Sequence, residues 1–190
     1  MKLLKKALLL AVLAATAASP ALARKITDDM GRSVNVPDKV SRVVVANIFP
    51  YASVATVYLG GADKIVGIHP VSMSAAKGGL LSEIYPDILK ADTSFMKGAS
   101  LSIERLMALK PDVVFVNAGD VNNIKAIENA GMNAVAISAS KWNYDVLKTY
   151  EHWLGTLQSI FPERKTADKA DAISKKTLKL VQSRVSGLKE

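Results

Sequence analysis

The side chains best suited to chemistry in this chain are aromatic, basic or metal-ligating, and they lie in several separate segments. Aromatic rings can stack on a planar ligand, and lysines can pair with an anionic one. His69 and Met73 are types that can ligate a metal, but a lone histidine beside Pro70 at a strand end is more often hydrogen-bonded or exposed, so we predict no metal bound directly. The predicted ligand-binding residues are Phe49, Tyr51, His69, Met73, Lys77, Met96, Lys97, Asn117, Trp142 and Tyr144.

Recognisable catalytic motifs are absent from the sequence. It has no Gly-x-Ser-x-Gly element, no glycine-rich phosphate loop after a strand, and no His, Asp or Glu cluster with the spacing of a zinc site. The chain has no cysteine, which excludes disulfides, thiolate metal sites and cysteine nucleophiles. We therefore predict a binding protein without an intrinsic cofactor rather than an enzyme. An exported enzyme on the same architecture is the alternative, since a fold does not fix a function.

The segment 100–116 shows which elements position these residues. Its first half carries apolar residues at helical spacing, and Pro111 should end that helix because proline disfavours helical geometry at the residue before it. Residues 113–116 are all apolar, as in a strand buried on both faces. Similar reasoning predicts a hairpin over 25–36 with its turn at Met30-Gly31, strands at 43–47, 64–68 and 134–137, helices at 52–59, 121–130 and 144–160, and a helix within 80–90 broken at Pro86.

This alternation predicts an α/β fold, namely a Rossmann-like lobe with a mainly parallel sheet and helices on both faces. In such sheets ligands bind outside the carboxyl ends of the strands, where loops and helix N-termini meet. We expect Gly60 and Gly61 to end the helix over 52–59, and residues 69–79 to form a polar loop. The loops expected to share the binding edge are 47–51, 69–77, 93–97, 117–120 and 138–144.

The first 23 residues have the pattern of a cleaved export signal. Three lysines precede a short apolar core, and Ala21-Leu22-Ala23 is a small-x-small cleavage pattern, so the mature chain should start at Arg24. The core is shorter than the roughly 20 residues of a membrane span, and the chain has no lipoprotein cysteine. Removing three lysines lowers the formal charge from +8 to +5, that is, 22 Lys and Arg against 17 Asp and Glu. No basic run alternates with aromatics, which argues against nucleic-acid binding.

The order of several segments resembles the N-terminal lobe of bacterial periplasmic proteins that bind ferric siderophores, haem, cobalamin and related metal chelates. Each segment alone is a common αβ string, but together they cover most of residues 26–160. The matching segments are 26–28 with 31–32 and 36–37 for the opening hairpin, 42–44 for the first core strand, 59–68 for the second βαβ element, and 98–120 with 129–131 for the third.

The resemblance implies a periplasmic protein whose ligand is a metal chelate, either a ferric siderophore, haem, cobalamin or a nickel complex. It also implies an ABC permease of the inner membrane as the partner. In this family a surface glutamate on each lobe docks onto permease arginines, and Ser102-Ile103-Glu104-Arg105 resembles the pattern around the first of them. Glu104 is therefore the predicted docking residue, although a carboxylate in a first helical turn is also favoured by the helix dipole.

Residues 163–188 carry one apolar stripe at helical spacing, enough for about 25 helical residues or roughly 37 Å. In the family that the chain resembles, one long helix joins the two lobes between which the ligand lies. We therefore divide the chain into a signal peptide (1–23), an N-terminal lobe (24–161) and a bridging helix (162–190) that stops before a second lobe. Two alternatives follow: an inactive fragment that does not transport, or a half-protein that needs a separately encoded second lobe.

Overall fold

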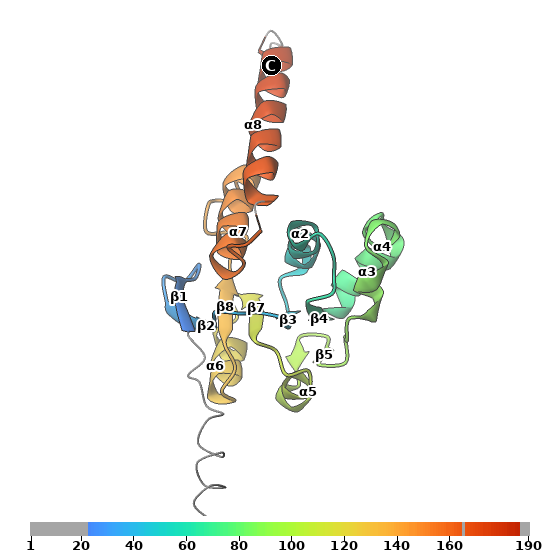
Figure 1. The fold of residues 1–190 in the computed structure, drawn as a ribbon, viewed down its shortest axis with the longest axis vertical. Helices are drawn as coiled ribbons and strands as arrows, with labels where there is room; N and C mark the ends of the chain where they lie inside the picture. The colour runs from blue at the N-terminus through green and yellow to red at the C-terminus, as the bar shows by residue number, and fades with distance from the viewer. Residues whose placement is uncertain (1–22, 165, 187–190) are drawn as a thin grey trace, which may run out of the picture.

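The chain forms a small sheet with helices on both faces, preceded by a hairpin and followed by a long helix (Figure 1). The computed structural model describes residues 23–164 and 166–186, except for the side chains of 166–171 and 174. The predicted leader thus lies outside the described residues, apart from Ala23. Among the described residues, no helix has the length and apolar composition of a membrane span.

The central sheet is built from β3 (Val43–Val45), β4 (Ile65–Ile68), β7 (Val113–Asn117) and β8 (Ala134–Ile137). All neighbouring pairs are parallel and the spatial order is β4-β3-β7-β8. Val43 therefore lies between Ile65 and Val113 in the register. The strands are nearly continuous buried apolar runs, as expected when helices cover both faces of a parallel sheet. The predicted α/β class with a mainly parallel sheet is confirmed.

The helices are α2 (Phe49–Leu59), α3 (Pro70–Gly78), α4 (Leu81–Ile84), α5 (Ile103–Ala108), α6 (Val121–Asn129), α7 (Val146–Ile160) and α8 (Thr166–Val185), with a 3-10 turn η1 (Pro86–Lys90) after α4. Alternate strand residues point to opposite faces and so supply two separate cores. Val43, Val45 and Phe115 pack with α2, α3 and α7, whereas Val44 and Val114 pack with α5 and α6. Figure 1 shows these two helix layers on opposite sides of the sheet.

Two small hairpins flank the sheet. β1 (Ala23–Thr27) and β2 (Ser33–Pro37) are antiparallel, and their turn contains Gly31 at φ 77°. This is the hairpin predicted from the sequence. The second, between β5 (Met96–Lys97) and β6 (Ser100–Leu101), was not predicted. Its strands have only two residues each, so they carry little of the hydrophobic alternation that reveals a strand.

The prediction of a polar loop over residues 69–79 was wrong, because most of this segment is helix α3. His69 caps the helix, and Pro70 occupies its first turn, where a missing backbone N–H costs nothing. Ser72, Met73 and Ala76 form the buried side. Small and polar residues on that stripe gave the segment too little apolar periodicity to be recognised as a helix.

Three predicted helix boundaries are confirmed. Gly60 ends α2 in the left-handed conformation at φ 70°, and its N–H meets the carbonyl oxygens of Thr56 and Val57. The break expected at Pro86 separates α4 from η1. α5 ends before Pro111, and Lys110 takes φ 47° where the chain turns into β7.

The predicted bridging helix begins as helix α8, whose 20 residues span roughly 30 Å. It projects away from the lobe in Figure 1. Ile173, Leu180 and Val181 are exposed on it. Residues 187–190, the predicted end of the bridging helix, lie outside the described residues.

Candidate functional site

The loops after β3 and β7 are joined by a polar cluster centred on Asn47. We call the edge formed by the residues that directly follow β3, β4, β7 and β8 the carboxyl rim: 46–49, 69–71, 118–123 and 138–145. The Asn47 amide nitrogen donates to Asp120 Oδ2 at 2.6 Å, and its oxygen accepts the Asn117 backbone N–H at 2.8 Å. Asp120 also caps α6, accepting the N–H and the side-chain amide of Asn123 at 3.2 and 2.6 Å. One asparagine therefore fixes two rim loops and a helix start.

Asn117, the last residue of β7, adjoins the rim as the sequence suggested, but Asn47 and Asp120 were not recognised as the residues that organise it. Only the positions of these two residues in the sequence could have indicated their role, because each lies in a predicted binding loop that follows a buried strand. Their mutual contact joins positions 73 residues apart. A single sequence contains nothing that pairs them.

His69 lies on the rim with both ring nitrogens engaged by the protein. Nδ1 accepts the Val71 backbone N–H at 3.1 Å, and Nε2 lies 3.2 Å from the Gly98 carbonyl oxygen. The imidazole packs against the Phe49 ring, with centroids 4.6 Å apart. Ligation of a metal by His69 would break one of these bonds. Phe49 itself is 44% exposed, so its ring is available to a ligand.

Three of the predicted ligand-binding residues are buried in the cores. Tyr51 is fully buried between Phe115 and Trp153, with ring centroids 4.9 and 5.4 Å away, so it is not available to a ligand in this arrangement. Met73 packs in the core beneath α2, α3 and α7, whereas Met96 packs in the core on the opposite face of the sheet. The structure therefore does not bring the two methionines together.

The two aromatics of the loop between β8 and α7 behave differently. Trp142 stacks on His152 of α7, with centroids 3.9 Å apart and planes at 10°, and Lys141 Nζ lies 5.7 Å from the Trp142 ring centre. Lys141, Trp142 and His152 line a hollow of about 400 Å³ between α7 and the β1–β2 turn. Tyr144 is 75% exposed and takes φ 59°. Tyr144 is therefore open to a ligand, whereas Trp142 is held by its own chain.

The predicted basic and acidic surface residues are all exposed. Lys77 lies in the last turn of α3 and Lys97 in β5 beside the turn that His69 contacts. Glu104 lies in the first turn of α5, after Ser102, whose hydroxyl accepts the Arg105 N–H at 3.4 Å. These exposed positions are compatible with the roles predicted for them. Among the residues whose placement is described, no three His, Asp or Glu side chains are grouped as a metal site.

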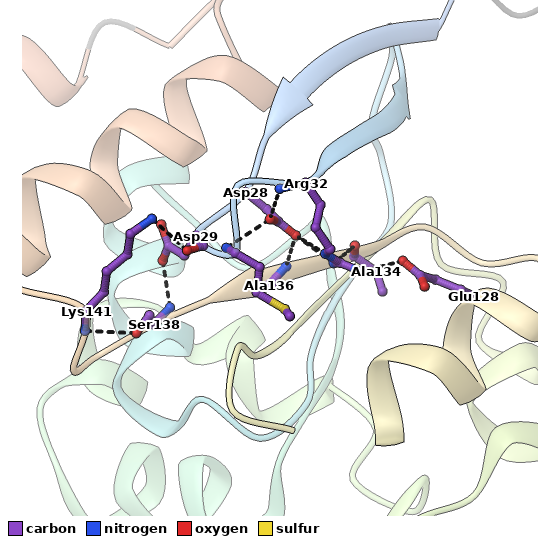
Figure 2. A network of polar contacts seen from close by, with 9 residues as sticks. Asp28, Asp29, Arg32, Glu128, Ala134, Ala136, Ser138 and Lys141 are labelled. Atoms are coloured by element: carbon purple, nitrogen blue, oxygen red, sulfur yellow. Dashed lines mark hydrogen bonds and ion pairs between the residues drawn. The ribbon is translucent and has the colours of Figure 1, made fainter. Parts of the chain in front are cut away.

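The β1–β2 turn is anchored to β8 by a second polar network (Figure 2). Asp28 pairs with Arg32 at 2.6 Å and accepts the Ala136 backbone N–H at 3.2 Å. Asp29 Oδ2 accepts the Ser138 N–H at 2.6 Å, and Lys141 Nζ donates to the Asp29 carbonyl oxygen at 2.7 Å. Burial raises the pKa of Asp29, while the Ser138 N–H opposes this shift.

Comparison with known proteins agrees with this architecture. No family model matches the chain. It is 37% identical over 137 residues to the molybdate-binding protein MolA of Haemophilus influenzae, a match that spans 70% of this chain and 37% of MolA. The structure of MolA bound to molybdate superposes with a TM-score of 0.71 and 27% identity, covering 87% of this chain and 55% of MolA.

Two further structures share the fold at lower identity. A periplasmic solute-binding protein of Veillonella parvula gives a TM-score of 0.77 at 22% identity, covering 89% of this chain and 50% of that protein. The heme-binding protein HmuT gives 0.61 at 24% identity, covering 87% and 50%. This chain resembles one lobe of the periplasmic solute-binding proteins of ABC transporters. It spans about half the length of the solved relatives, which are binding proteins and not enzymes.

Proposed function

We propose that this solute-binding lobe serves an ABC importer in the periplasm by capturing a metal-containing ligand at its carboxyl rim and delivering it to the inner-membrane permease. The observation that carries the proposal is the 37% identity to MolA, combined with the same lobe fold. The rim supports it as well. Asn47 and Asp120 fix two of its loops, and Phe49 and Tyr144 are exposed aromatic residues in the segments that follow β3 and β8.

The ligand is proposed to contact the protein through its outer atoms rather than through a bond from the protein to the metal. Both nitrogens of His69 already have protein partners, which leaves no free imidazole donor there. The candidates are the chelates expected from the sequence, namely a ferric siderophore, haem, cobalamin or a nickel complex, together with molybdate, which MolA binds. The exposed Phe49 ring favours a ligand with a planar or aromatic part.

The lobe alone supplies half of an interlobe site, so the affinity of this chain by itself should be weak. A ligand pocket normally buries most of the ligand surface, and one wall can bury only part of it. The proposed complement is a second lobe, either on the same polypeptide or separately encoded. A fragment that no longer transports is the competing proposal, and rescue of tight binding by an added second lobe would decide against it.

Calorimetric titration of the mature chain with molybdate, haem and a ferric siderophore tests the proposal. Binding of one of them should weaken about tenfold in Phe49→Ala, because the exposed ring lies at the rim. Val57→Ala is the matched control, since Val57 is similarly exposed at 46% on the same helix but lies away from the rim. Equal losses in both variants, or no binding of any probe even with a second lobe present, would count against a rim site.

Glu104 is proposed to dock onto the permease. Its carboxylate is exposed, and reversing a surface charge usually changes stability by no more than about 0.5 kcal/mol. Removing one partner of an interfacial ion pair costs about 2 kcal/mol or more of association. Glu104→Arg should therefore keep the wild-type melting temperature and bind the permease more weakly at low salt. Glu83→Arg, an exposed charge reversal in α4, should bind normally, and a matching defect there would remove the special role of Glu104.

Export is the remaining part of the proposal. The small-x-small pattern at residues 21–23 should direct cleavage before Arg24. The Arg24 side chain donates to the Asp38 carbonyl oxygen at 2.6 Å, so a chain that starts at Arg24 keeps this contact. Mass spectrometry of periplasmic extract should find a chain that starts at Arg24. A periplasmic or cytoplasmic chain that retains Met1 would contradict a cleaved leader.

A further inference from the structure

His69 contacts or belongs to four segments of the lobe beside the carboxyl rim. It follows β4, caps α3 through Nδ1, lies over the Phe49 ring at the start of α2, and reaches the Gly98 carbonyl oxygen through Nε2. The Val71 N–H requires an acceptor at Nδ1, so Nε2 carries the proton and donates to Gly98. These three contacts are uncharged and use both nitrogens of the ring. The side chain is 5% exposed, so water cannot readily replace them.

The segment that His69 reaches has little else to hold its tip. β5 and β6 pair over two residues each, and hairpins this short are marginal alone. Gly98 forms the turn at φ 59°, and no atom lies within 4 Å of the place where a Cβ would be. Met96 is buried and anchors one strand, but Lys97 and Gly98 are exposed. The bond from His69 therefore adds a direct link between the turn at Gly98 and the residue that follows β4.

We propose that His69 is a positioning residue of the rim: through Nε2 it fixes the turn that carries Lys97, and with its ring it orients Phe49. The α3 cap through Nδ1 is a separate, structural use of the same side chain. The value of this placement for ligand capture rests on the proposed function, whereas the tether itself does not. His69 then affects ligand affinity by holding two ligand-facing residues, and it touches no ligand metal.

The two nitrogens can be tested separately because two amide side chains each imitate one of them. His69→Asn places an oxygen where Nδ1 lies and keeps the cap, whereas His69→Gln places a nitrogen near Nε2 and keeps the bond to Gly98. Hydrogen exchange of residues 96–101 is the primary readout. It should speed up about fivefold in the Asn variant and stay close to wild type in the Gln variant. The Gln variant, which loses the cap, should melt about 2–4 °C lower.

Asp145→Ala is the matched control, because it removes the α7 cap and leaves the His69 contacts intact. It should lower the melting temperature similarly without changing exchange in 96–101. The tether is overturned if the Asn variant keeps wild-type exchange there, or if Asp145→Ala speeds exchange equally. Titration with molybdate, haem and a ferric siderophore then tests the role in ligand binding. Affinity should fall in both variants, because both lose the ring that packs against Phe49. It should fall about fivefold further in the Asn variant, which also releases the turn at Gly98. If the wild type binds none of these three probes with a second lobe present, the proposed function fails, while the exchange result still decides the tether.

Discussion

The two polar networks of the lobe, at the β1–β2 turn and at the carboxyl rim, compensate charge in different ways. The Asp28 side chain is completely buried and forms an ion pair with Arg32, which also pairs with the exposed Glu128 at 2.6 Å. The negative charge is thus compensated by a positive one. Asp120, half-buried on the rim, is held by the neutral amides of Asn47 and Asn123. The turn network is therefore a fixed anchor, whereas the rim network holds its loops without a counterion.

This difference between the two networks indicates which part of the lobe tolerates substitution. A buried ion pair tolerates loss of neither partner, because the remaining charge is stranded away from water. Amide bonds to a half-exposed carboxylate cost less to lose, because water can replace part of each bond. We therefore expect the anchor to constrain folding and the rim to tolerate change, so that ligand preference can differ between relatives on one fold.

The largest expected effect is at the anchor. Asp28→Ala removes the buried partner of Arg32 and the acceptor of the Met30, Arg32 and Ala136 backbone N–H groups. It should lower the free energy of unfolding by about 3–5 kcal/mol, measured by urea denaturation. Glu128→Ala removes only the exposed partner and should cost less than about 1 kcal/mol. Similar losses in both variants would show that the anchor does not depend on the buried carboxylate.

An intermediate effect is expected on the rim. Asn47→Ala breaks the link from β3 to Asp120 and leaves the Asn117 N–H without its acceptor, at a cost of about 1–3 kcal/mol. A double-mutant cycle with Asp120→Ala should give a coupling of about 0.5–3 kcal/mol, because the two side chains are in direct contact. Additive losses would mean that the rim loops are held independently, and the contrast with the anchor would lose its basis.

The smallest effect concerns Asp29, the half-buried carboxylate of the β1–β2 turn network. Burial raises its pKa in the folded protein, so between the unfolded and folded pKa values the folded state binds more protons. Stability from this group therefore rises as pH falls from neutral through the folded pKa, and the burial cost remains at higher pH. Asp29→Asn should stabilise by less than about 1 kcal/mol at pH 7, since the carboxyl is only half-buried. The gain should shrink toward pH 4 in urea titrations, and a gain that grows on acidification would have the wrong sign.

The layer structure could be predicted from the sequence because it depends on patterns within single segments. The apolar run 113–116 and the proline at 111 define a strand and a helix end locally, and both are in the structure. The error over residues 69–79 has a local reason too. α3 buries Ser72 beside Met73, so its inward face is half polar and resembles a loop.

The candidate site was less predictable because its contacts join distant residues. Tyr51 was predicted to be a ligand-binding aromatic, yet Ala52, Ala55 and Tyr58 are buried with it on one helix face. This helical spacing could have been read from the sequence. Nothing in the sequence shows that Trp142 stacks on His152, or that His69 reaches Gly98. Loops could be assigned to the rim from strand order, but the direction of each side chain could not.

The strand order also determines when each part of the sheet could form during the proposed export. If the chain is exported as proposed, β3 would cross the membrane early. Its neighbour β7 follows long after it in the chain, with α2, β4, α3, α4, η1, β5, β6 and α5 between them. Sheets that depend on such distant pairings form slowly, because the entropy of loop closure is lost before the strand contacts can stabilise the sheet. A chain exported from its N-terminus would therefore emerge with β3 and β4 half-covered until residues 113–137 have crossed. Slow formation of the sheet keeps the chain unfolded while it crosses the membrane. During that interval the apolar strands Val43–Val45 and Ile65–Ile68 must be protected from aggregation.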